Sequence, residues 1–202
     1  MLGVAPRLRR ALALGLVSVS LSALAPAAAH AATDPEIPAA AADPAPDDLR
    51  PGQYRWHPEA GPAEGPVSIV VSIPLQRAWV FRGGALIGVS TISSGQPGYD
   101  TPTGAFPILQ KRVDHRSNIY DGAPMPYMQR LTWDGIALHA GQIPGHPASH
   151  GCVRLPRAFA QRLYGVTELG ALVVVSDEAP ATPAEALALA APLPAEIQLA
   201  AD

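Results

Sequence analysis

Short apolar runs rich in β-branched residues alternate with segments containing Gly and Pro between positions 53 and 176. Residues 67–73 and 78–81 have the composition of strands, and residues 86–93 continue this pattern after the turn dipeptide Gly83-Gly84. Three strands joined by short turns predict a β-meander at the start of this region.

The second half of the region predicts more strands and a helix. Strands are expected over residues 106–113, 135–138 and 171–176, because each is an apolar run bounded by Gly, Pro or polar residues. Pro156 suits the first turn of a helix, where its missing amide hydrogen costs nothing, and the following residues show an apolar helical face. Residues 183–191 could form a second short helix. The fold class expected from the pattern is mainly β.

The first 31 residues have the organisation of an export signal. Three arginines precede an apolar run over residues 11–24, and the small-residue cleavage sequence Ala29-His30-Ala31 follows. An uncleaved membrane anchor is the alternative, but the run is shorter than the roughly 20 residues that span a bilayer. We therefore expect a signal peptide at residues 1–31, export to the periplasm or cell wall, and no integral membrane span in the mature chain.

Composition divides the rest of the chain into three parts. Residues 32–66 are rich in Pro and Ala and predict an extended spacer, since such a sequence buries too little apolar surface to fold alone. Residues 67–178 carry most of the predicted strands and form the expected folded domain. Residues 179–202 are again rich in Ala and Pro and are expected to be a loosely ordered tail.

The charge balance and the cysteine content narrow the range of possible functions. The 202-residue chain has 14 Lys and Arg against 17 Asp and Glu, and removal of residues 1–31 takes away three arginines and leaves 11 basic residues. Binding to nucleic acid is not expected, because it depends on clustered basic residues. Cys152 is the only cysteine, so an exported form has no disulfide framework. A lone thiol in an oxidising compartment indicates a nucleophile.

The sequence around Cys152 supplies the groups that thiol catalysis needs. A thiol with a pKa of about 8.5 is mostly protonated at neutral pH, so a nucleophilic cysteine requires a base. His139, at the end of the strand predicted over residues 135–138, could take the thiol proton and return it to a leaving amine. The backbone amides of Gly151 and Cys152 are candidate donors to the oxyanion, and Gly151 can adopt a positive φ.

Two other interpretations of these residues stay open. Cys152 could be a buried structural thiol, although its polar neighbours are unusual in a hydrophobic core. A zinc site could use His139, His146, His150 and Cys152, but their spacing fits no familiar zinc motif. No metal ion or other cofactor is therefore expected.

Two separated motifs resemble those of a known family. Residues 149–155 read Ser-His-Gly-Cys-Val-Arg-Leu and follow Leu-His-Ala-Gly at 138–141, while Gly-Tyr-Asp-Thr-Pro-Thr-Gly stands upstream at 98–104. Together they resemble the catalytic domain of the L,D-transpeptidases, over residues 67–176. The resemblance implies a β-sandwich or partly open barrel with one or two short helices.

The resemblance also implies an activity. In this family the donor is a peptidoglycan stem tetrapeptide, so Cys152 would take the acyl group of the third residue as a thioester and release D-alanine. An amine acceptor then gives a crosslink, an exchanged D-amino acid or a protein attached to the wall, whereas water makes the enzyme an L,D-carboxypeptidase. A non-catalytic wall-binding module is the alternative.

Within the site, the resemblance implies that the carbonyl of Ala140 orients the imidazole of His139. Thirteen positions separate His139 from Cys152, which is short for the family and implies a trimmed loop over the site.

The predicted substrate-binding residues flank the cysteine–histidine pair and comprise Ser149, His150, Arg154, Tyr127 and Trp133. The guanidinium of Arg154 suits either a carboxylate of the substrate or a structural ion pair. Tyr127 and Trp133, with Tyr120 and Met125, could form the wall of a peptide groove. His115 and His57 are interpreted as surface residues without a catalytic role.

Overall fold

The computed structural model describes residues 49–191. The predicted signal peptide at residues 1–31 lies outside the described residues, as do much of the predicted spacer and the end of the tail. Within the described range, neither helix has the length and apolar composition of a membrane-spanning segment.

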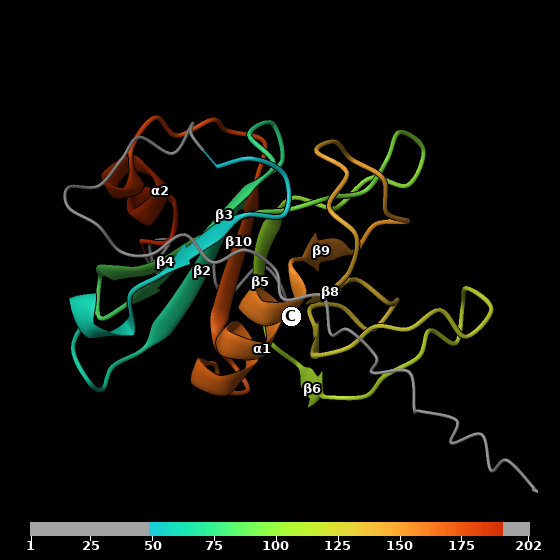
Figure 1. Cartoon of the computed structure of the whole chain (residues 1–202), viewed down its shortest axis with the longest axis horizontal. Helices are drawn as coiled ribbons and strands as arrows, with labels where there is room; N and C mark the ends of the chain where they lie inside the picture. The colour runs from blue at the N-terminus through green and yellow to red at the C-terminus, as the bar shows by residue number, and fades with distance from the viewer. Residues whose placement is uncertain (1–48, 192–202) are drawn as a thin grey trace, which may run out of the picture. The chain divides into compact units, whose positions relative to one another are not determined.

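The strands of the described residues form two sheets, which Figure 1 shows together with the helices. The larger sheet has the order β1-β4-β3-β2-β10-β5 and contains β1 (Tyr54–Trp56), β2 (Val67–Ser72), β3 (Arg77–Arg82), β4 (Ala85–Thr91), β5 (Gly104–Pro107) and β10 (Leu172–Ser176). The smaller sheet has the order β6-β7-β8-β9 and contains β6 (Gln110–Arg112), β7 (Met128–Arg130), β8 (Ala137–Ala140) and β9 (Val153–Leu155). The helices are α1 (Arg157–Val166) and α2 (Pro183–Leu189), with a 3-10 turn at Pro58–Ala60. The mainly β class is confirmed, and the two sheets do not join into a closed barrel.

Alternate residues of the larger sheet face two hydrophobic cores. Ile69 and Val71 of β2 lie in the core shared with the smaller sheet and α1, whereas Val70 lies in the core that includes α2. A strand buried on both faces needs apolar residues at every position, which explains the continuous apolar runs in the sequence. Phe159 of α1 packs into the first core, and Ala186 of α2 packs into the second. The first core therefore holds the smaller sheet against the larger one.

Hydrogen bonds on both sides fix the backbone of β9, the strand that follows the cysteine. β9 pairs in parallel with β8, with Leu138 opposite Val153 and His139 opposite Arg154. On its other side, Arg154 exchanges two backbone hydrogen bonds with Ser93, of 2.9 and 3.1 Å. Because Ser93 follows β4 of the larger sheet, β9 is tied to both sheets.

The structure differs from the sequence prediction over residues 106–113. This run is not one strand, because β5 belongs to the larger sheet and β6 to the smaller. Between them, the amide of Ile108 donates to the carbonyl of Ala171, and that of Leu109 donates to Arg130. The sequence pattern does not reveal that the two halves pair with different partners. β7 has no counterpart among the predicted strands, because its residues follow a loop rich in Pro and Met and depend on pairing with β6 and β8.

Both ends of the described range pack on the larger sheet. Tyr54 and Trp56, at the end of the segment expected to be a spacer, are buried, with ring centroids 5.5 and 5.4 Å from that of Phe159. The second short helix is present as α2, and its residue Ala186 is fully buried. Composition averaged over these segments hides the few apolar side chains that anchor them.

Candidate active site

β8 and β9 present different residues on their two faces. Leu138 and Val153 lie opposite each other and point into the first core, between the two sheets. His139 and Arg154 form the next pair, and side chains alternate along a strand, so these two project from the other face. Cys152 precedes β9 and lies two residues before Arg154, which places it on the same face as His139.

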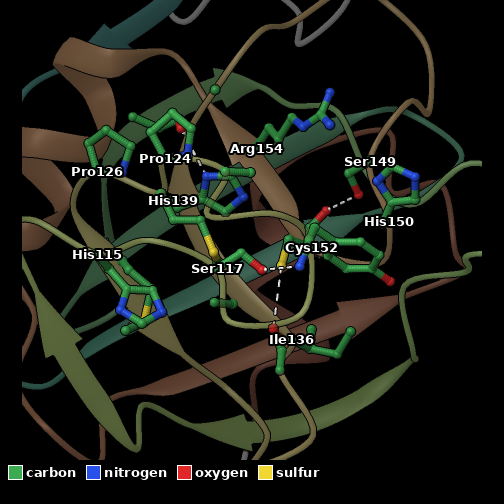
Figure 2. Close-up of a pocket in the computed structure, with 18 of the residues that line it drawn as sticks. His115, Ser117, Pro124, Pro126, Ile136, His139, Ser149, His150, Cys152 and Arg154 are labelled. Carbon is green, nitrogen blue, oxygen red and sulfur yellow. Dashed lines mark hydrogen bonds between the residues drawn. The ribbon is translucent and has the colours of Figure 1, made fainter.

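A pocket of about 630 Å³ opens on this face. His139, Cys152 and Arg154 all line it, and Figure 2 shows them grouped in one cavity. Residues 115–126 and the turn at residues 134–136 supply much of the remaining wall. The nucleophile and base predicted from the sequence therefore meet in one cavity that is large enough for part of a peptide.

One wall of the pocket is a flap, which we define as residues 113–127. Its two arms are held together by backbone hydrogen bonds of 2.9 Å from Ser117 to Ala123 and from Met125 to His115. A further bond of 2.8 Å joins the amide of Tyr127 to the carbonyl of Val113 at the base of the flap. The flap is thus an irregular hairpin that covers one side of the cysteine.

The imidazole of His139 is buried and oriented by the backbone. Its Nδ1 lies 2.9 Å from the carbonyl oxygen of Ala140, the contact that the family resemblance implies. A carbonyl can only accept, so this bond assigns the proton to Nδ1 and leaves Nε2 as the basic nitrogen. Burial lowers the pKa of His139 to about 4, against the opposing effect of the Ala140 carbonyl and with further lowering by Arg154 and His115. The ring is therefore neutral at pH 7 and able to accept a proton.

The thiol of Cys152 is also held in its neutral form. Burial raises the pKa of this thiol, while the backbone amide of Ala137 and the cations Arg154 and Arg130 act in the opposite direction. The thiol lies 3.5 Å from the carbonyl of Gly135, as a donor to that oxygen. The resting pair is thus a thiol and a neutral imidazole.

Ser149 organises the loop that carries the cysteine. Its hydroxyl accepts the amide hydrogen of Gly151 at 3.1 Å and donates to the carbonyl of Cys152. Gly151 has the positive φ expected from the sequence, 106°, and a Cβ there would stand 2.8 Å from Cδ1 of Ile136. The loop needs glycine at this position, and the Gly151 amide already has an acceptor within the loop.

Thr101 is a positioning residue that the sequence prediction does not include. Its hydroxyl donates to the carbonyl of Gly151 at 2.8 Å and accepts the amide hydrogen of Gly95 at 2.8 Å. The segment at residues 98–104 therefore acts by holding the cysteine loop. The signal in the sequence was the motif itself, but only the folded chain shows which residue makes the contact.

His150 packs between two aromatic rings at the rim of the pocket. Its ring centroid is 4.5 Å from that of Tyr99, in an edge arrangement, and 4.7 Å from that of Tyr120, which stacks on it. Tyr120 belongs to the flap, so this contact joins the flap to the cysteine loop. The ring contacts of His150 therefore connect the cysteine loop with the flap.

The predicted aromatic wall is only partly present. Tyr120 and Met125 line the pocket, whereas Tyr127 and Trp133 are absent from its described lining. Tyr127 packs toward the first core and lies beneath the guanidinium of Arg157, 5.4 Å from the ring centroid. Trp133 is 74% exposed, on the turn before β8. Spacing along the chain cannot show where the flap directs each ring.

His115 is not the isolated surface residue that the sequence suggests. It is half-buried, lines the pocket, and has its pKa lowered by burial and by Arg130 and Arg112. The fold of the flap brings it to the catalytic face from a position far upstream in sequence. No spacing pattern in the sequence points to this contact.

The residues of the alternative zinc site do not converge. Within residues 49–191, no three His, Cys, Asp or Glu side chains are grouped as a metal site. His146 is exposed, with Nδ1 against the carbonyl of Pro147, and His150 is stacked between tyrosines.

Comparisons with known proteins agree with this geometry. A family model described as the L,D-transpeptidase catalytic domain matches residues 66–175. Among curated proteins, the probable L,D-transpeptidase 3 of Mycobacterium tuberculosis is 31% identical over 109 residues, covering 45% of this chain and 39% of the relative. The chain thus spans about two fifths of the length of that relative.

Solved structures share the fold. An L,D-transpeptidase from Stackebrandtia nassauensis is 29% identical with a TM-score of 0.52, over 61% of this chain and 62% of that one. L,D-transpeptidase 3 from Mycobacterium tuberculosis, in complex with a faropenem-derived adduct, is 28% identical with a TM-score of 0.51, over 55% and 61% of the two chains. The two packed sheets and the matched segment, which covers more than half of the sequence, show that this chain belongs to the L,D-transpeptidase catalytic-domain family.

Proposed function

We propose that this protein is an exported peptidoglycan L,D-transpeptidase that carries the acyl group as a thioester on Cys152. The donor is a stem tetrapeptide, cleaved after its third residue. The observation that carries the proposal is the placement of Cys152 and a neutral, backbone-oriented His139 in one pocket. In this proposal, residues 1–31 direct export to the periplasm or cell wall, and residues 67–178 are the catalytic domain between a spacer and a tail.

Acylation begins with a neutral base. The Nε2 of His139 takes the thiol proton as Sγ of Cys152 attacks the carbonyl carbon of the third residue. The imidazolium then gives this proton to the departing amine, the C–N bond breaks, and D-alanine leaves. Because burial raises the pKa of the thiol, proton transfer accompanies the attack.

The oxyanion requires hydrogen-bond donors that point to where the negative charge develops. The amide of Cys152 is the proposed first donor, and the amide of Gly151 is the second. The Gly151 amide would exchange its bond to the Ser149 hydroxyl for one to the oxyanion. Ser149 keeps its bond to the carbonyl of Cys152 during this exchange and so preserves the shape of the loop.

An amine completes the reaction. It gives a proton to His139 and attacks the thioester carbon, and Sγ of Cys152 leaves with that proton as the thiol. The amine decides whether the product is a crosslink, an exchanged D-amino acid or a protein attached to the wall. With water as the acceptor, the same steps give an L,D-carboxypeptidase.

The remaining predicted residues have supporting roles in the proposal. Arg154 contacts the donor, and His150 holds the flap to the cysteine loop through Tyr120. Trp133, which is largely exposed, contacts parts of the substrate that extend beyond the pocket. Tyr127, which packs against the first core, supports the base of the flap.

Incubation of the purified protein with a defined disaccharide tetrapeptide tests the proposal. We expect mass spectrometry to show loss of D-alanine together with a dimer, or with an exchanged product when a D-amino acid is added. The variant Cys152→Ala is the matched control and should give neither product. A tripeptide as the sole product would identify an L,D-carboxypeptidase. Binding to cell wall without any product in the parent protein would identify a wall-binding module.

A further inference from the structure

Arg154 places an uncompensated cation beside the reacting groups. It lines the pocket, lies opposite His139 in the β8–β9 register, and follows Cys152 by two residues. Within residues 49–191, its guanidinium has neither an ion pair nor a side-chain hydrogen bond. Strand geometry separates the Cα atoms of residues 152 and 154 by roughly 6.6 Å, which is within reach of one residue of bound peptide.

The other arginines of the pocket are already engaged. The Nε of Arg130 donates to Oε1 of Gln110 at 3.1 Å, and the guanidinium of Arg157 lies over the ring of Tyr127. Asp134 is the one acidic residue among the described lining residues. The pocket therefore has an excess of positive charge, with Arg154 as the cation available to a ligand.

The fold holds Arg154 in a defined place. Its backbone is fixed by Ser93 on one side and by β8 on the other. Its side-chain stem runs over Gly141, where a Cβ would stand 2.9 Å from Cγ of Arg154. The absence of a side chain at position 141 leaves a slot for this stem, so the direction of the guanidinium is built into the site.

We propose that Arg154 binds a free carboxylate of the donor peptide and makes the enzyme select donors in which that carboxylate is not amidated. This inference rests on the proposed function and specifies its substrate class. An arginine recognises a carboxylate through two parallel charge-assisted hydrogen bonds, whereas a carboxamide is neutral and offers one oxygen. The carboxylate is either the C-terminus of the leaving residue or the side chain of the third residue.

Three matched donors distinguish these two sources. They are a tetrapeptide with both carboxylates free, the same peptide amidated at its C-terminus, and the same peptide amidated on the third side chain. The measured quantity is kcat/KM for acylation of Cys152 in the full-length protein. We expect one of the two amidated donors to have a kcat/KM about 10- to 100-fold below that of the donor with both carboxylates free. The position of its amide identifies the carboxylate that Arg154 binds.

In the variant Arg154→Gln, kcat/KM on the donor with both carboxylates free should fall by a similar factor. The variant should also use this donor and the poorly used amidated donor equally well, because the substitution and the amidation remove the same contact. Arg154→Lys should recover part of the preference. Arg157→Gln is the control, because it removes an equal charge from the pocket and should keep the ratio between acid and amide.

Equal use of all three donors by the parent protein would overturn the inference, whether or not the variants fold. A proportional loss on all three donors in Arg154→Gln would overturn it as well, because Arg154 would then act on the fold or on the nucleophile. Failure of every donor to acylate Cys152 would instead remove the proposed function, and the inference with it.

Discussion

The two faces of the β8–β9 pair have different roles, although their residues are neighbours in the sequence. On one face, Leu138 and Val153 are fully buried among apolar side chains and contribute to the core. On the other, His139, Cys152 and Arg154 line a pocket. The backbone hydrogen bonds that align the core residues also set the register of the reactive ones. The packing of the core face therefore determines the positions of the side chains on the pocket face.

Burial on the pocket face disfavours the charged forms of its titratable side chains. His139 is only 8% exposed, so its protonated form is disfavoured relative to water. The same burial that lowers its pKa keeps it neutral and available as a base. Changes on the pocket face should therefore alter chemistry more than stability, and changes on the core face should do the reverse.

The largest effect is expected for Cys152→Ala. Removal of the proposed nucleophile should lower transpeptidation by at least about 10⁴-fold, since a catalytic unit loses most of its effect when its nucleophile is removed. The free energy of unfolding should change by about 1 kcal/mol or less, because the variant loses a single sulfur atom from a partly exposed site. Product formation and denaturant titration measure the two quantities. Residual activity within tenfold of the parent protein would place the nucleophile elsewhere.

His139→Asn should have the next largest effect. Loss of the base should lower the acylation rate by about 10²- to 10⁴-fold, the usual contribution of general acid–base catalysis. In the parent protein, the rate should be nearly constant from pH 7 to 5 and fall near pH 4, where the imidazole becomes protonated. Stopped-flow acylation across pH checks this profile. An acid limb near pH 6.5 would mean that His139 is not held neutral by burial.

Leu138→Ala tests the core face. The variant should lose about 2 to 5 kcal/mol of unfolding free energy, because a fully buried leucine leaves a cavity. The acylation rate of the folded fraction, measured well below the thermal midpoint, should stay within a fewfold of the parent rate. A loss of rate as large as that of His139→Asn, with a retained fold, would break the division between the two faces.

Protonation of His139 on the pocket face should change the free energy of unfolding by an amount comparable to the Leu138→Ala substitution. The pKa of His139 is about 4 in the folded protein and 6.5 as the model value, so between these pH values the unfolded chain binds a proton that the folded protein does not. Stability is therefore retained above pH 6.5 and falls as the pH decreases to about 4, by about 3 kcal/mol from this group. In His139→Asn, the difference in unfolding free energy between pH 7 and 4 should shrink by that amount. An unchanged difference would show that other groups control the acid limb.

Part of the candidate site was predictable from the sequence. His139 stands at the end of a predicted strand, and the Ser-His-Gly-Cys motif identifies Cys152 as the candidate nucleophile. The contributions of His115 and Thr101 were not predictable, because both come from segments that reach the site only when the flap and the loop at residues 98–104 fold against the smaller sheet.

The position of Tyr127 outside the described pocket lining was not predictable either. Its backbone adopts a left-handed conformation, with φ of 56°, which nothing in the local sequence indicates for a tyrosine. The local sequence pattern therefore predicts which side chains a strand directs to each of its faces, whereas the contacts of an irregular flap depend on the whole fold.

The most direct test of the central claim is peptide mapping by mass spectrometry after incubation with a carbapenem such as imipenem. The claim is that Cys152 is a nucleophile activated by His139 on the open face of β8–β9. We predict a single covalent adduct on the peptide containing Cys152, formed much more slowly in His139→Asn and absent in Cys152→Ala. An unmodified Cys152 peptide, under conditions in which a known L,D-transpeptidase is fully acylated, would contradict the account.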